Sequence, residues 1–166
     1  MQALVAYFSQ TGNTKKVAEA IFGELGEDAE IKALADVEDL DAYDLSFIGF
    51  PIIGFGPAKE GKSFLADHAA GKRVALFTTH ASPEDSEPLR EWLARCEEAA
   101  SGAELVGIFD CQGELAEQIA GLLSESADPE LRAFAEARSE TIGQPDATSL
   151  DKARAFAREI MDAVKG

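Results

Sequence analysis

Short apolar runs alternate with stretches of helical periodicity along the whole chain. Each run is bounded by turn-forming residues, which is typical of buried strands. Five strands are predicted in this way: Ala3 to Phe8, Ala29 to Leu34, Leu45 to Phe50 with its end at Pro51, Arg73 to Thr79, and Glu104 to Asp110. Apolar spacings of three and four residues predict helices at Val17 to Leu25, Lys59 to His68 and Leu89 to Ala100, and near 114–124, 129–138 and 149–164.

This alternation predicts an α/β fold with a doubly wound, five-stranded parallel sheet and helices on both faces. A chain of 166 residues matches one domain, so we expect a single domain over residues 1–166. An extra helical segment at about 128–145 is predicted either to cover the domain or to form a flap that faces a partner.

The excess of acidic residues limits the classes of binding partner that the chain is expected to have. With 15 basic and 31 acidic residues, the net charge is −16, which disfavours nucleic acid and anionic membranes and favours a basic protein partner. The longest uncharged stretches, Met1 to Thr14 and Leu45 to Ala58, are too short to span a membrane, and no basic region precedes the first apolar run. Two cysteines, Cys96 and Cys111, without metal-ligand spacing fit a reducing cytoplasm, which is the expected location.

Ligands of such sheets bind outside the carboxyl ends of the strands. The loops there are Ser9 to Thr14, Pro51 to Ala58 and His80 to Asp85. We therefore expect the function to lie in these three loops.

The first of these loops, SQTGNT, joins a strand to a helix N-terminus. Its donors are the hydroxyls of Ser9, Thr11 and Thr14 and the Asn13 amide, and Gly12 permits close approach of the backbone. The helix dipole favours an anion there, so the loop suits a terminal phosphate without a cation of its own. An ordinary helix cap uses the same residue types and remains an alternative.

Several phosphate-handling sites are excluded by motif. The chain has neither GxxxxGK[ST] nor GxGxxG after a strand. No acidic pair ends the first strand, and neither cysteine has an arginine six residues later. A nucleotide P-loop, a phosphoryl-accepting receiver domain and a loop-cysteine phosphatase are therefore not expected.

The second loop is apolar although loops are usually exposed. Ile52, Ile53 and Phe55 would suit a flat aromatic ligand, and a hydrophobic turn packed on the next helix is the alternative. His80 is either beside the ligand, titrating near neutrality, or an exposed loop histidine, which is the favoured interpretation. Trp92 is predicted to be a core residue and Cys111 a buried structural one.

The string YFSQTGNT, Tyr7 to Thr14, resembles the phosphate loop of flavodoxins, roughly [ST]xTGNT after the first strand. The resemblance extends to strand and helix order over nearly the whole chain and implies the strand order 2-1-3-4-5 and bound flavin mononucleotide, FMN. It implies three sets of cofactor-binding residues: Ser9, Gln10, Thr11, Gly12, Asn13 and Thr14 at the phosphate; Pro51, Ile52, Ile53, Gly54, Phe55 and Gly56 on one side of the ring; and Thr79, His80, Ala81 and Ser82 on the other.

The chain departs from the best-known flavodoxins near the ring. The third-strand loop has no Trp, the fourth-strand loop reads TTHAS without the usual Tyr, and the extra length lies before Gln144. These departures concern the ring contacts and leave the phosphate loop intact.

The resemblance implies a low-potential electron carrier that shuttles electrons between redox enzymes. Acidic, cation-poor surroundings would disfavour the anionic reduced ring, and a glycine carbonyl beside flavin N5 would come from Gly54 or Gly56. An FMN-dependent NAD(P)H oxidoreductase of quinones or small molecules is the alternative, and a non-redox binding module is a third. The expected partners are basic-surfaced redox proteins, and the expected state is a monomer.

Overall fold

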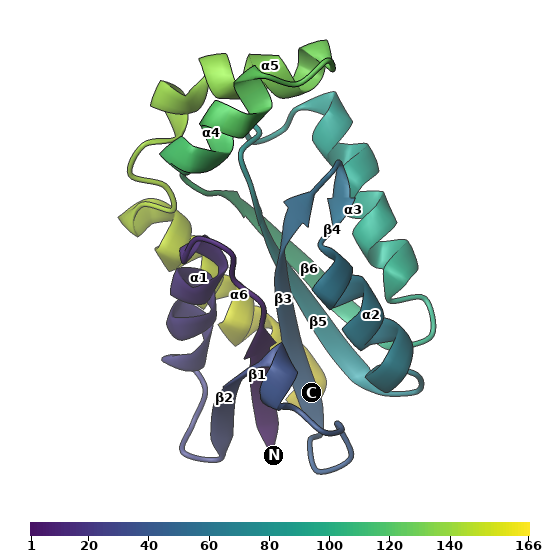
Figure 1. Cartoon of the computed structure of the whole chain (residues 1–166). Helices are drawn as coiled ribbons and strands as arrows, with labels where there is room; N and C mark the ends of the chain where they lie inside the picture. Colours follow the sequence, from purple (N-terminus) through teal and green to yellow (C-terminus); the bar gives the residue numbers. More distant parts are fainter.

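The computed structural model describes residues 1–166, in which strands and helices alternate (Figure 1). The strands are β1 (Ala3–Tyr7), β2 (Ala29–Ala33), β3 (Leu45–Ile53), β4 (Gly56–Pro57), β5 (Arg73–His80) and β6 (Glu104–Gln112). The α-helices are α1 (Asn13–Phe22), α2 (Lys59–His68), α3 (Glu87–Ala99), α4 (Glu117–Ser124), α5 (Pro129–Glu136) and α6 (Ala147–Lys165), and short 3₁₀ turns lie at Leu34–Asp36 and Arg138–Thr141. None of the helices has both the length and the apolar character needed to cross a bilayer.

Five strands form a parallel sheet in the order β2-β1-β3-β5-β6. Val5 on β1 lies opposite Ile31 on β2 and Phe47 on β3, which fixes the register at the centre of the sheet. The predicted doubly wound sheet and its order are confirmed, with β5 and β6 as the fourth and fifth predicted strands. The short β4 is an addition that pairs antiparallel with β3.

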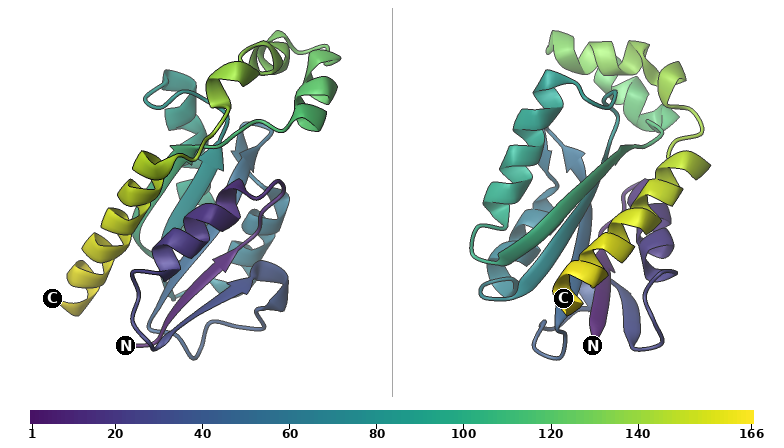
Figure 2. Two further views of the ribbon diagram at one scale, coloured as in Figure 1. Left: turned by 90° about the vertical axis from the view of Figure 1, so that its left-hand side faces the viewer. Right: turned by 180° about the vertical axis from the view of Figure 1, so that it is seen from behind.

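Helices cover both faces of the sheet. Figure 2 shows α1 and α6 on one side and α2 and α3 on the other. Alternate residues of a strand point to opposite faces, so Val5 and Phe47 enter the core under α1 and α6, whereas Leu4 and Ile48 enter the core under α2 and α3. Each fully buried side chain of this size stabilises the fold by about 1.5–3 kcal/mol.

The end of β3 differs from the prediction. The strand does not stop at Pro51, because proline lacks only the amide donor, and its carbonyl accepts a hydrogen bond from Ala58 N at 3.0 Å. The chain continues to Ile53 and turns back into β4 through Gly54 (φ 63°) and Phe55 (φ 67°). Two successive left-handed residues are the signature of a two-residue type I′ hairpin.

Phe55 is an unfavourable residue for a left-handed position, at a cost of about 1–2 kcal/mol. Two contacts offset this cost. Its ring lies 5.2 Å from the Trp92 ring, measured between centroids, and Arg95 Nη1 donates to its carbonyl oxygen at 2.7 Å. The apolar loop therefore packs on α3, the second helix after it, as well as preceding α2 directly.

Helices α4 and α5 form a separate pair above the sheet. We call residues 117–136 the roof; in Figure 1 it lies at the end of the sheet opposite the two chain termini. Helix α5 begins with Pro129 and with the Asp128 side chain accepting from Glu130 N at 2.9 Å, an N-cap arrangement. The predicted extra segment at 128–145 contains α5 and the 3₁₀ turn at Arg138–Thr141, and its role as a cover or as a flap stays a prediction.

Candidate functional site

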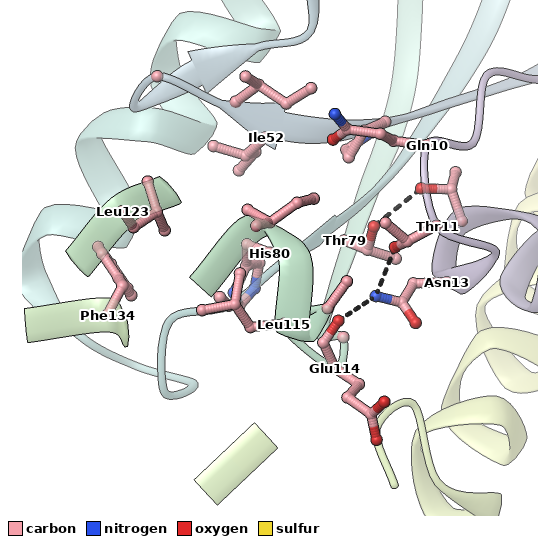
Figure 3. Close-up of a pocket in the computed structure, with 18 of the residues that line it drawn as sticks. Gln10, Thr11, Asn13, Ile52, Thr79, His80, Glu114, Leu115, Leu123 and Phe134 are labelled. Atoms are coloured by element: carbon pink, nitrogen blue, oxygen red, sulfur yellow. Dashed lines mark hydrogen bonds between the residues drawn. The ribbon is translucent and has the colours of Figure 1, made fainter. Parts of the chain in front are cut away.

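A cavity of ≈ 220 Å³ opens at the carboxyl ends of β1, β3 and β5, below the roof (Figure 3). It brings together the three loops singled out by the sequence. Most of the predicted site residues line it: Ser9, Gln10, Thr11, Asn13, Thr14, Pro51, Ile52, Ile53, Gly54, Phe55, Thr79, His80 and Ala81. Gly12, Gly56 and Ser82 do not.

These three residues have structural places next to the cavity. Gly12 has φ 100° and precedes α1, a conformation that favours glycine. Gly56 belongs to β4 and pairs with Ile53. Ser82 is buried, and its hydroxyl lies 2.8 Å from that of Ser86 at the start of α3.

One end of the cavity is rich in hydrogen-bond donors. Ser9 Oγ accepts from the amides of Gly12 (3.1 Å) and Lys15 (3.3 Å), so Ser9 does serve as a cap for α1. Five backbone amides are left without a partner in the chain, those of Ser9, Gln10, Thr11, Asn13 and Thr14. Unpaired amides at a helix N-terminus bind anions. The loop therefore caps the helix and still leaves free amides that could bind an anion.

Two side-chain contacts fix this end. Thr14 Oγ1 and Thr79 Oγ1 lie 2.8 Å apart and are both buried, which joins the first loop to β5. Asn13 Nδ2 donates to the Glu114 carbonyl oxygen at 2.8 Å, which joins it to the chain after β6 (Figure 3). A Cβ at Gly113 would lie only 2.5 Å from Asn13 Nδ2, so this approach requires glycine. Neither Gly113 nor Glu114 is among the predicted site residues, although both line the cavity.

The middle of the cavity is a slot between the β3–β4 hairpin and the end of β5. His80 belongs to β5, one residue beyond the predicted strand end, and its side chain is 1% exposed. The favoured prediction of an exposed loop histidine is therefore wrong. Its Nε2 lies 2.8 Å from Asp110 Oδ2 on the neighbouring strand, and its Nδ1 is buried without a partner. A carboxylate partner of this kind fixes the orientation of the imidazole ring.

The far end of the cavity is apolar and was not predicted. Trp92, which is 7% exposed as expected of a core residue, also lines the cavity, and its ring centroid lies 5.8 Å from that of Phe134 in α5. The roof and its approach contribute the other missed residues, Leu115, Ala116, Ile119, Leu123, Leu131 and Phe134. The available signal was the helical spacing of Ile119 with Leu123 and of Leu131 with Phe134.

The cavity contains almost no formal charge. Neither lysine nor arginine lines it, and its one carboxylate, Glu114, accepts from Gly143 N at 2.9 Å. An anion at the donor-rich end would thus be held by neutral groups and the helix dipole. Nearby, burial raises the pKa of the Cys111 thiol to about 12, with the negative charge of Asp110 as a smaller cause. This agrees with the predicted buried structural cysteine.

The chain is similar to known proteins over almost its whole length. It is 29% identical over 171 residues to the flavodoxin-like domain-containing protein BilS of Clostridioides difficile (strain CD3), with 97% of each chain covered. The oxidised flavodoxin 2 of Bacillus cereus shares the fold with a TM-score of 0.62 and 23% identity, covering 98% of this chain and 99% of that one. A flavoprotein from Lactobacillus acidophilus NCFM, solved in complex with FMN, has a TM-score of 0.54 and 24% identity over 66% of this chain and 92% of its own.

A family model decides the membership. The model described as a flavodoxin domain matches residues 4–158, which include every residue that lines the cavity and all of the five parallel strands except Ala3. The phosphate-loop resemblance at Tyr7 to Thr14 and the observed strand order agree with that match. The chain belongs to the flavodoxin family.

Proposed function

We propose that this protein binds FMN in the cavity and transfers electrons between redox proteins. The observation that carries the proposal is the division of one cavity into a donor-rich end without cations and an apolar slot. A phosphate dianion suits the first and a flat ring the second. The residues present therefore fit the cofactor.

The roles of the residues follow from their places. The free amides of Thr11, Asn13 and Thr14 would hold the phosphate, and the hairpin and the end of β5 would hold the two sides of the ring. Bound FMN would supply reversible one- and two-electron transfer. The chain would position the cofactor and set its electrostatic surroundings.

Those surroundings favour a low reduction potential. The net charge is −16, and no cation lines the cavity to balance an electron added to the ring. Added negative charge is less stable in such a field, because like charges repel and a low-dielectric slot screens them poorly. A reductive titration against a reference dye would give the potentials.

A basic protein partner is the proposed electron acceptor or donor. The roof beside the cavity bears exposed carboxylates at Glu117, Glu125, Glu130 and Glu136. Opposite charge on a partner would steer the encounter near the cavity and would make its rate fall with added salt. We further propose a monomer in the reducing cytoplasm, in keeping with two free, buried cysteines.

The test of FMN binding is direct. The protein as purified should show flavin absorption, and the apoprotein should take up one FMN with quenching of flavin fluorescence. Riboflavin should bind much more weakly, because it lacks the phosphate. A colourless protein that takes up no FMN would leave a non-redox binding module as the better description.

A second candidate is an FMN-dependent oxidoreductase of small molecules. The roof favours it, because Leu123 and Phe134 add an apolar chamber that a carrier has no need of. Steady NADH oxidation by the pure protein, without a partner reductase, would support the enzyme. Electron transfer only in the presence of a partner protein would support the carrier.

A further inference from the structure

The inner face of the roof is apolar and faces the cavity. Ile119 and Leu123 in α4 and Leu131 and Phe134 in α5 are half-buried and line the cavity. Leu122, next to Leu123, lies outside this lining and is 72% exposed. In Figure 3, Leu123 and Phe134 lie across the cavity from Thr11 and Asn13.

The roof is held by hydrogen bonds between the segments that precede and follow it, and few of its own residues are buried. Helix α5 has no buried residue, and α4 has only Ala120. Below the roof, Leu115 N donates to Thr141 Oγ1 at 2.9 Å, and Arg138 Nε donates to the Leu115 carbonyl oxygen at 2.9 Å. The roof therefore stands over the cavity without packing on the sheet, and its apolar face remains only partly covered.

The family resemblance places the flavin ring between Pro51 to Gly56 and Thr79 to Ser82. The four roof residues and Trp92 lie outside both loops. Phe55, Trp92 and Phe134 form a row of aromatic rings with centroid separations of 5.2 and 5.8 Å along this end. Rings at such separations accept a further flat ring by offset or edge-to-face contact.

From this arrangement we propose that the chamber beneath the roof binds a planar, uncharged aromatic molecule next to the flavin ring. The proposal rests on the proposed function, since bound FMN would form one wall of the chamber. An uncharged ligand is indicated because neither lysine nor arginine lines the cavity, and the roof contributes only apolar side chains, without the free backbone amides that the first loop offers to an anion. Binding such a ligand would remove the apolar lining from water, which is favourable, and the ligand would fill the space between the roof and the flavin ring.

The test compares two neighbouring leucines in the oxidised FMN-loaded protein. The ligand is 2-methyl-1,4-naphthoquinone, and 1,4-naphthoquinone-2-sulfonate is its anionic counterpart; binding is measured by calorimetry. We expect saturable binding of the first and at least about tenfold weaker binding of the second, because a buried unpaired charge is costly. Leu123→Asp should weaken quinone binding by at least about tenfold for the same reason. The matched control Leu122→Asp should bind it like the wild type.

The dissociation constant of FMN, measured first on each apoprotein, separates the two proposals. Failure of the wild-type apoprotein to take up FMN would refute the proposed function. Normal FMN uptake without saturable quinone binding would overturn the chamber alone. So would a Leu123→Asp protein that loses FMN and quinone together, because the roof would then belong to the flavin site. If Leu123→Asp does not fold, Phe134→Ala takes its place, with the same expectations for quinone and FMN binding.

Discussion

The hydroxyl pair of Thr14 and Thr79 gives the sharpest test of the phosphate end. The two oxygens are 2.8 Å apart, and the residues are 1% and 2% exposed, so each hydroxyl is the hydrogen-bond partner of the other in a largely buried position. In the FMN-bound protein we expect Thr79 to donate to Thr14, which leaves the Thr14 hydrogen free for the phosphate. Valine at either position removes one hydroxyl and keeps the shape.

The two substitutions should therefore have different effects on FMN affinity. A hydrogen bond to a charged group contributes about 1.5–3 kcal/mol, so Thr14→Val should raise the dissociation constant of FMN by about 10- to 150-fold. Thr79→Val leaves the Thr14 donor in place and should raise it by less than about threefold, or about 0.6 kcal/mol. Riboflavin, which has no phosphate, should bind both variants like the wild type.

Stability of the apoprotein supplies an independent measurement. Each single substitution leaves a buried hydroxyl unpaired, at a cost of about 1–3 kcal/mol in the free energy of unfolding. The double variant leaves none unpaired, so its loss should be smaller than the sum of the two by about 1 kcal/mol. Urea unfolding of the four proteins gives this coupling. Tight FMN binding by Thr14→Val would refute the assignment of its hydroxyl to the phosphate.

Three further predictions concern other parts of the site. Gly113→Ala places a Cβ 2.5 Å from Asn13 Nδ2 and should weaken FMN binding, whereas Gly121→Ala, with no atom within 4 Å, should bind FMN normally in the same fluorescence titration; equal affinities would contradict this. Phe55→Gly should be more stable than Phe55→Ala by about 1 kcal/mol in urea unfolding, reversing the usual order, because only glycine adopts the left-handed position freely. Burial raises the pKa of the Cys111 thiol from 9.0 to about 12, so the folded state holds its proton longer and stability should fall as pH rises from 9 towards 12. Cys111→Ala should reduce that fall, measured by urea unfolding at pH 8 and 10.5, and equal slopes would show that the thiol does not contribute.

The sequence predicted the parts of the fold that depend on local pattern. Apolar runs such as Leu45 to Phe50 marked the buried strands, and the donors and glycine of the loop from Ser9 to Thr14 marked one end of the cavity. The ends of strands were less well predicted where hydrogen-bond pairing with a neighbouring strand set them. Strand β3 passes through Pro51 because the hairpin with β4 pairs its last residues, and β5 includes His80 because β6 pairs with it.

The amino-acid order alone determined the order of strands and helices, the supply of hydrogen-bond donors at the start of α1 and the acidic character of the chain. Only the tertiary structure decided that Trp92 joins the cavity, that His80 is buried against Asp110, and that Leu123 rather than Leu122 faces inward. Local periodicity states which face of an element is apolar. It does not predict which residues that face packs against, because the packing depends on how distant segments such as α3 and α5 are brought into contact by the fold.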